Sequence, residues 1–157
     1  MTYDVETLLT DIETFLKANL PTQIAAINLE KNDTIALRNV DNNAYFYQTM
    51  NEKIEAYDPF LYLGVSNIAT DGIGPHTSKT VTIQVIIALS DRNGDNTIVK
   101  RIFRYARALE DLFHGKWNTF SNSQKLEINS LAPVTLDLLN SSEFHKAGGV
   151  ELVTSFG

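Results

Sequence analysis

The sequence lacks cysteine, and this absence excludes several kinds of chemistry. None of the 157 residues is a cysteine, so disulfides, thiolate metal sites and cysteine nucleophiles are ruled out. Histidine is scarce: the chain has only His76, His114 and His145, and no two of them stand at the spacing of a metal-binding pair. We therefore expect no metal site, no cofactor and no catalytic residues, and a protein that is not an enzyme.

Long apolar runs and a leader-like start are also missing. No apolar stretch approaches the ~20 residues that a membrane helix needs, and Met1–Glu6 is acidic where a signal peptide would be basic. We expect a chain that stays in the cytoplasm and touches no membrane. Acidic residues outnumber basic ones by 19 to 13, for a net charge of −6. Such a surface repels nucleic acid on average, so any affinity for phosphate has to be local.

What the sequence does contain suffices for one folded domain. Hydrophobic residues make up 43% and charged residues 20% of the chain, as in ordinary globular proteins. We predict that residues 1–157 form a single α+β domain. Its mainly antiparallel sheet of about four strands would be packed by an N-terminal helix and a long central helix.

The centre of the chain predicts one long strand followed by one long helix. Thr80–Leu89 alternates in polarity, and Asp91–Asp95 has turn chemistry. A helix would then run from Asp95 or Asn96 to Gly115, a natural left-handed cap. The apolar stripe predicted for this helix comprises Val99, Ile102, Phe103, Ala106, Leu109 and Phe113.

The first third of the chain predicts two helices and then an ambiguous stretch. Asp4–Ala18 has helical apolar spacing, Pro21 would end that helix, and Gln23–Leu29 would form a short second one. Between Thr34 and Pro59 two interpretations stay open. The first is a small hairpin of Thr34–Leu37 with Ala44–Gln48, and the second is a helix through Phe46, Met50, Ile54 and Tyr57. The aromatic side chains there either cover the core, which we favour, or form a contact surface.

A long loop is the first candidate contact region. Phe60–Val65 predicts a short strand antiparallel to Thr80–Leu89, and the connection Ser66–Lys79 is long for a hairpin. Loops of this length are usually functional, so we interpret it as an arm that contacts a partner. Its candidate contact residues are Asn67, Asp71, Ile73, His76 and Lys79. Gly72–Pro75 resembles half of a phosphate loop, but no helix follows it, and we reject that function.

The last third predicts two strands. Trp117–Ser123 would be a polar connection, Gln124–Leu131 a strand ended by Pro133, and Val134–Asn140 a strand or a helical turn. After a hinge at Gly148 and Gly149, a final strand Val150–Phe156 would lie at the sheet edge and pair with a neighbouring subunit. The candidate contact residues on it are Val150, Leu152 and Thr154.

A row of basic residues marks the outer face of the central helix. Lys100, Arg104 and Arg107 follow one another at helical spacing, with Arg101 beside them and Asp111 at the end. One hypothesis is a local surface for an acidic partner or a phosphate. The alternative, which we favour, is a solvated helix face that includes an Arg107–Asp111 ion pair.

Taken in order, these elements resemble the tail terminator (tail-completion) proteins of tailed bacteriophages. The resemblance lies in the arrangement: helix Val5–Leu16, strand Phe60–Val65, strand Thr80–Leu89, helix Thr97–Gly115 and two late strands, the last being Val150–Phe156. It covers about two-thirds of the chain. Residues 34–59 and 66–79 fit the arrangement less well.

The resemblance implies a structural protein of the virion, made in the host cytoplasm. Such a protein would form a homo-oligomeric ring, a hexamer, on the head-proximal end of the tail tube. There it would stop tube growth, contact the tube protein and the head-side connector or neck protein, and let DNA pass through its lumen as cargo. Two alternatives remain: another phage neck or head-completion protein, and a cytoplasmic α+β domain that binds a small ligand.

Overall fold

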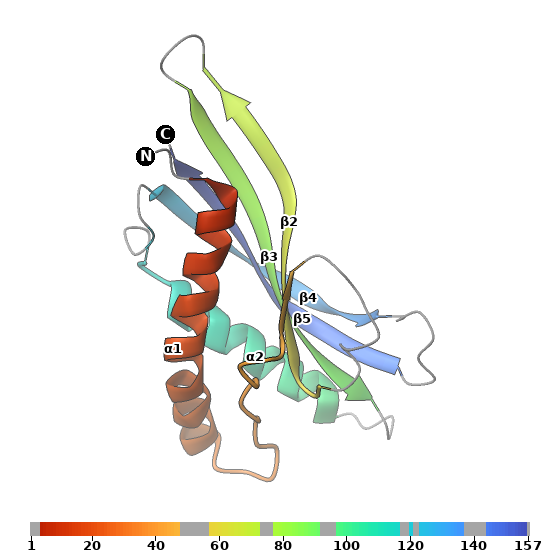
Figure 1. Ribbon diagram of the computed structural model, residues 1–157. Coiled ribbons are helices and arrows are strands. Elements are labelled where there is room, and N and C mark those ends of the chain that lie inside the picture. The colour runs from red at the N-terminus through yellow and green to blue at the C-terminus, as the bar shows by residue number, and fades with distance from the viewer. Residues whose placement is uncertain are drawn as a thin grey trace.

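Two helices and five strands make up the part of the chain that the computed structural model describes, which is residues 4–47, 57–72, 77–91, 97–116, 120, 123–136 and 144–156 (Figure 1). The elements are α1 (Val5–Lys31), β1 (Tyr45–Tyr47), β2 (Phe60–Asp71), β3 (Ser78–Asp91), α2 (Thr97–Phe113), β4 (Ser123–Leu136) and β5 (Phe144–Phe156). The strands form one sheet in the order β1-β2-β3-β5-β4. All neighbours are antiparallel except β1 and β2, which are parallel. The predicted α+β class is confirmed, with one strand more than expected.

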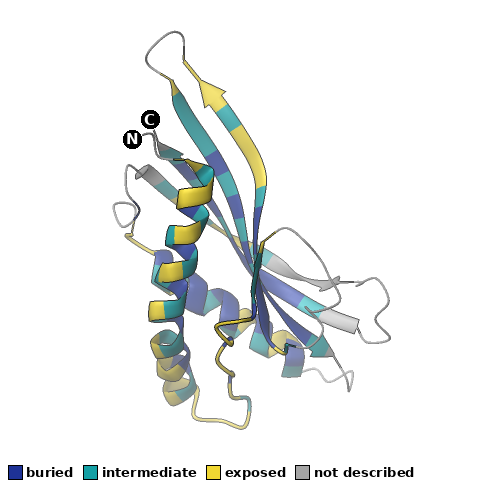
Figure 2. Cartoon of the chain, in the orientation of Figure 1, coloured by how far each residue is buried: buried dark blue, intermediate teal, exposed yellow. Residues whose placement is uncertain are grey.

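The helices lie on one face of the sheet (Figure 2). On the helix side, alternate residues of the central strands are buried; Val85 of β3 and its cross-strand partner Val150 of β5 are both 0% exposed. They pack in one core with the apolar stripes of α1 and α2. On the other face, the paired residues Gln84 and Glu151 are only partly buried. Alternating polarity in β3 produces this arrangement, as predicted.

α1 continues through Pro21, so the predicted end of the helix there is wrong. An interior proline costs about 3 kcal/mol. Beyond it, however, the helix carries Ile24 and Ile27, which are buried like Leu20 before it. Burying each such side chain contributes about 1.5–3 kcal/mol, so continuing the helix is the more stable outcome. Asp4 caps the start of the helix, and its carboxylate accepts a 2.8 Å hydrogen bond from the Thr7 N–H.

β2 and β3 form a hairpin much longer than predicted. Positions that were expected to be loop, from Ser66 to Asp71, belong to β2, and Asp71 pairs with Ser78 at the start of β3. The register shifts between Val65 and Asn67. This bulge leaves Ile68 opposite the buried Val81, so Ile68 lies on the helix side of the sheet. The end of the hairpin projects past the first turn of α1 (Figure 1).

β5 lies between β3 and β4, so its predicted position at the sheet edge is wrong. The predicted hinge at Gly148 and Gly149 lies within β5. A Cβ atom at Gly149 would lie 2.0 Å from the Val85 carbonyl oxygen, so glycine there permits the close approach of β3 and β5. Pro133 does not end β4 either, because the strand continues to Leu136 through a register shift between Leu131 and Val134.

Three further expectations are corrected. Residues 34–37 form no strand, and β1 pairs with β2, so the predicted hairpin is wrong. On α2, Val99 and Phe103 are 38% and 58% exposed, while Ile98 and Tyr105 are buried. Phe120, predicted to lie in a polar connection, is 2% exposed and packs on Phe15 and Phe113. Of the aromatic residues in this stretch, Tyr45, Phe46 and Tyr57 pack against the core, as favoured, but Tyr47 is 41% exposed. The proposed helix through Met50 and Ile54 falls mainly outside the described residues.

Candidate interaction site

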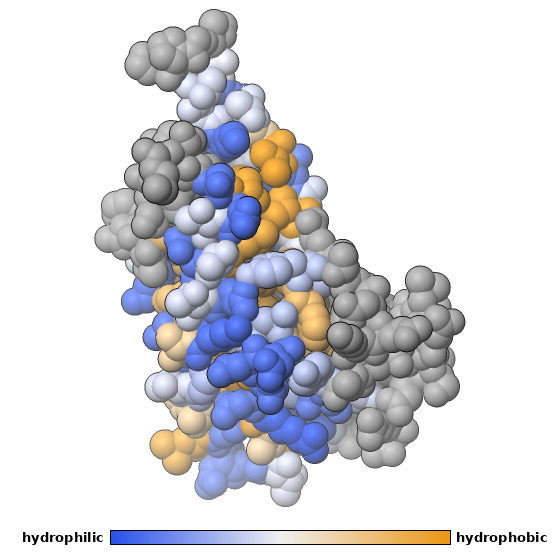
Figure 3. Space-filling view, in the orientation of Figure 1, coloured by the Kyte–Doolittle hydropathy of each residue, from blue (hydrophilic) through white to orange (hydrophobic). Residues whose placement is uncertain are grey.

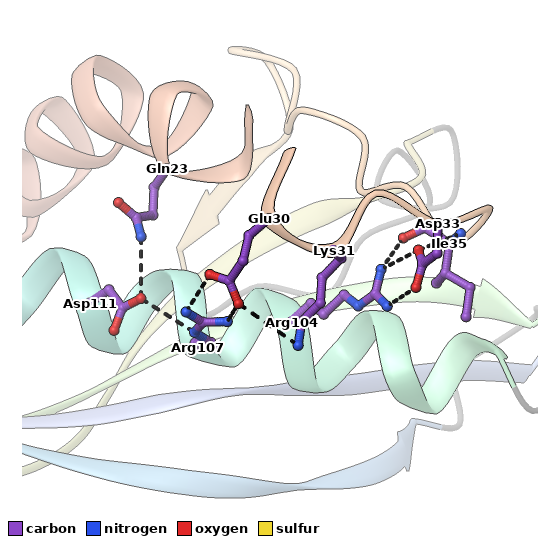
Figure 4. Close-up of polar contacts among 8 residues, drawn as sticks. All are labelled: Gln23, Glu30, Lys31, Asp33, Ile35, Arg104, Arg107 and Asp111. Carbon is purple, nitrogen blue, oxygen red and sulfur yellow. Dashed lines mark hydrogen bonds and ion pairs between the residues drawn. The ribbon is translucent and has the colours of Figure 1, made fainter. Parts of the chain in front are cut away.

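The basic row on α2 is bound mainly to acidic residues of this same chain (Figure 4). Arg104 forms a two-pronged ion pair with Asp33, with Nη1–Oδ1 at 2.9 Å and Nη2–Oδ2 at 2.5 Å, and also donates to the Ile35 carbonyl. Arg107 binds both carboxylate oxygens of Glu30 at 2.9 and 2.8 Å. The row therefore fastens α2 to the end of α1 and to the segment after it.

The prediction favoured from the sequence, a solvated helix face with an Arg107–Asp111 ion pair, is confirmed in part. Arg107 Nε lies 3.6 Å from Asp111, and Asp111 also accepts a 3.3 Å hydrogen bond from Gln23 of α1. The hydrogen bond from Arg104 lowers the pKa of Asp33 from its ordinary 3.8 to about 2. Lys100 is exposed beside this network. Because Arg104 and Arg107 are neutralised within the chain, the row presents little basic charge to an acidic partner.

The candidate contacts on the last strand are not on the surface. Val150 and Leu152 are 0% exposed and Thr154 is 1% exposed, all on the helix side of the sheet. They contribute to the core and are removed from the set of contact residues. The alternating pattern of β5 predicts a strand correctly but carries no information on which strand lies beside it.

The candidate contacts on the arm have different outcomes. Asn67 and Asp71 are exposed on β2, and Lys79 is partly buried on β3. Lys79 contributes an attraction that, after the hydrogen bonds from Thr7, helps to lower the pKa of Asp4 at the start of α1. Ile73 and His76 lie outside the described residues. The arm thus presents two strands where a loop was predicted.

A groove runs between the outer side of this hairpin and the first turns of α1. Its volume is about 810 Å³, and its walls come from α1, the end of β1 and the middle of β2. The lining residues are Val5, Glu6, Leu9, Thr10, Tyr47, Val65, Ser66, Asn67 and Ile68. Figure 3 shows apolar side chains gathered in one area along this side of the molecule. Ile68 is 50% exposed there.

Hydrogen bonds and a ring contact fix the wall of the groove formed by β1. The Tyr47 hydroxyl donates to Glu13 of α1, and Lys17 Nζ lies 2.5 Å from the other carboxylate oxygen of Glu13. Lys17 also lies 5.1 Å from the centre of the Tyr45 ring. Partial burial alone would raise the pKa of Glu13, but the hydrogen bonds from Lys17 and Tyr47 lower it. Burial raises the pKa of Tyr45 to about 12. These contacts hold β1 against α1 at this side of the groove.

Sequence reasoning did not find the groove. Val5 and Leu9 fit the apolar spacing of the predicted first helix, and Val65 ends the predicted strand Phe60–Val65, so none of the three was singled out as a contact residue. The signal was Ile68: a large apolar residue in a segment predicted to be a solvated loop. Only the bulge at Ser66 brings Ile68 to the same side as Val65, and a bulge leaves no clear mark in a sequence.

The described residues give little support for a metal site, a membrane-spanning helix or a histidine-based site. Among them, no three histidine, aspartate or glutamate side chains are placed to hold a metal ion. No helix among them is long and apolar enough to cross a membrane. His114 is exposed after the end of α2, and His76 is outside the described part of the chain. The fold and the groove define a single-domain α+β protein with an apolar site between α1 and β2. No protein-family model matches the sequence, and no curated protein matches it significantly.

Proposed function

We propose that the protein is a structural subunit without catalytic activity, and that it acts as the tail terminator of a tailed bacteriophage. The observation that carries this proposal is the long β2–β3 hairpin, which projects from the body and presents an apolar groove along its outer side. A subunit of an assembly needs such a surface to bind its neighbour. The order of elements that resembles tail terminators adds support.

In this role the subunits form a ring, a hexamer by resemblance, at the head-proximal end of the tail tube. The ring stops the addition of tube subunits and joins the tube to the head-side connector. The acidic excess of the chain disfavours adhesion of passing DNA if acidic residues line the lumen.

Mass spectrometry of density-purified phage particles from the source of this sequence tests the proposal. We expect peptides such as Trp117–Lys125 at low abundance relative to tube and capsid subunits. Particles assembled without the protein should carry tails of uncontrolled length, because nothing then stops tube growth. Normal tail lengths would assign the protein to another position in the neck. Absence from particles whose tube and connector proteins are detected would overturn the proposal.

The groove itself favours a second candidate, a domain that binds a small apolar ligand. Its volume of about 810 Å³ falls within the range of small-molecule sites. A ligand that binds the folded state alone raises the melting temperature with its concentration. A screen of apolar compounds that produces a saturable rise, and a loss of that rise in Leu9→Asn, would favour this candidate over the structural one.

A further inference from the structure

We infer that the outer edge of β2 binds β4 of a second copy of this chain, so that the sheet continues from one subunit into the next. The inference rests on the proposed function as an assembly subunit, and it names the partner at the groove as the next copy. Three observations on the described residues carry it: an exposed edge, an outer strand of sufficient length, and matching apolar sides.

In the described part of the chain, the edge of β2 beyond the bulge is exposed and has few of the features that usually block pairing. β1 pairs only with Leu61–Leu63, and no strand in the described part of the chain pairs with the outer side of Asn67–Asp71. Exposed strand edges in stable monomers are usually blocked by proline, lysine or inward-pointing charge. Asn67–Asp71 contains no proline and no lysine, and the bulge lies just before it; its one charge is Asp71 at the end, and it includes Ile68, which is 50% exposed.

β4 is the strand at the opposite end of the sheet, and it is long enough to cover this edge. Asn67–Asp71 spans about 16 Å and Lys125–Leu131 about 23 Å at the usual rise of a strand. Lys125–Leu131 pairs continuously with β5 on its inner side. The register shift between Leu131 and Val134, which brackets Pro133, disrupts the strand only beyond this stretch. β4 and the part of β2 beyond β1 therefore offer edges of compatible length.

The apolar sides of the two strands also correspond. Leu126 and Ile128 of β4 pair with Thr154 and Leu152 of β5, so they lie on the helix side of the sheet, and at the end of the sheet they remain only partly buried. Residues on the same side of paired strands adjoin each other. A β4 strand added to β2 would place these two side chains in the groove beside Ile68.

The proposed contact joins two different patches of one surface, so it is heterologous. Such a contact repeats from subunit to subunit and closes into a ring when the rotation between subunits allows it. An isologous alternative, β2 against β2, would give only a dimer. The two arrangements predict different cross-links between copies: position 68 to position 128 for β2 against β4, and position 68 to position 68 for β2 against β2.

Cross-linking with single cysteines distinguishes them, because the natural chain has no cysteine. Ile68→Cys and Ile128→Cys are prepared as separate variants of the full chain, mixed, and treated with a short thiol cross-linker. We expect the mixed 68–128 product to exceed both homodimers several-fold. The matched control replaces Ile128→Cys with Leu29→Cys, whose side chain is 81% exposed and lies about 28 to 36 Å along α1 from the groove residues of that helix. A dominant 68–68 product, or equal yields with the control, would overturn the inference.

Sedimentation of the untagged protein provides a second measurement. We expect concentration-dependent self-association that Ile68→Lys weakens at least about tenfold, through loss of apolar burial and placement of a lysine on the edge. Leu29→Lys makes the same charge change at a remote exposed site and should leave association unchanged. If both variants associate like the natural chain, the edge of β2 is not the contact. Neither measurement needs phage particles. The pairing of β2 with β4 can therefore fail while the protein is still found in virions, and it can hold while the protein is absent from them.

Discussion

Asp33 is the residue that shows most directly how the acidic and basic residues of this chain are used. Its carboxylate lies in a loop after α1, yet the guanidinium of Arg104 from α2 binds both of its oxygens. The pair is formed by residues far apart in sequence, so it ties the segment after α1 to α2. Because the pKa of Asp33 is lowered, its contribution to stability depends on pH in a predictable direction.

Replacing Asp33 with asparagine should lower the melting temperature at neutral pH and flatten its dependence on acid. Asp33 has a pKa of about 2 in the folded protein and 3.8 ordinarily. Its stabilising effect is therefore complete above about pH 4 and is lost as pH falls toward 2. Thermal unfolding followed by circular dichroism from pH 7 to pH 2 measures this. Asp71→Asn, at an exposed site, is the control, and equal effects of both variants would contradict the prediction.

Gly149→Ala should destabilise the protein by about 1–3 kcal/mol, the usual cost of overpacking. The added methyl group meets the Val85 backbone at 2.0 Å, and a backbone atom in the middle of a sheet cannot move aside. Gly64→Ala is the matched comparison, because there the nearest atoms belong to the Tyr62 ring, at 2.6 Å. Denaturant unfolding should give the larger loss for Gly149→Ala. A larger loss for Gly64→Ala would mean that the Tyr62 ring cannot move.

At the scale of elements, the apolar side chains that α1 buries stabilise it as one continuous helix. Pro21 interrupts its hydrogen bonding, but the buried residues Leu20 and Ile24 lie on either side. We predict that Pro21→Ala raises the free energy of unfolding, by up to about 3 kcal/mol. Thr22→Ala, at an exposed neighbouring position, controls for helix propensity alone. A loss of stability in Pro21→Ala would instead show that the packing of α1 needs the distortion that proline introduces.

The β2–β3 hairpin can be shortened without disturbing the core. Ile68 and Val81 are cross-strand partners, so residues 69–80 can be replaced by Asn-Gly, which favours a tight hairpin turn. We expect a folded protein with a melting temperature within a few degrees of the natural one, since the deleted residues are exposed or only partly buried where they are described. Incorporation into phage particles should be lost. Normal incorporation would contradict the role of the hairpin as a contact arm.

The elements predicted from sequence were those whose pattern is local. Thr80–Leu89 alternates in polarity, and in β3 alternate residues such as Val81, Ile83 and Val85 are buried. The misassigned features depend on neighbours distant in sequence. Nothing within Val150–Phe156 states that β4 and β3 flank it, and nothing near Pro21 states that Ile24 will be buried. The groove depends both on local sequence patterns and on neighbours distant in sequence, so only part of its lining was predictable.

At the scale of the whole molecule, net charge opposes assembly. Each copy carries a formal charge of −6, so copies in contact repel one another. Salt screens such repulsion over about 10 Å at 0.1 M. Since the proposed contact at Ile68 is apolar, raising the salt concentration from about 50 to 500 mM should strengthen self-association in sedimentation experiments. Weaker association at high salt would indicate instead that ion pairs between copies hold the assembly together.

The position of β5 also governs when the protein can fold during its synthesis. β3 and β4 do not touch as neighbouring strands; each pairs with β5, which the ribosome makes after both. The sheet therefore remains in two separate parts until β5 has left the ribosome, and the apolar sides of β3 and α2 stay without their largest partner until then. A nascent chain stalled before Phe144 should accordingly bind chaperones, and one released after Phe156 should not.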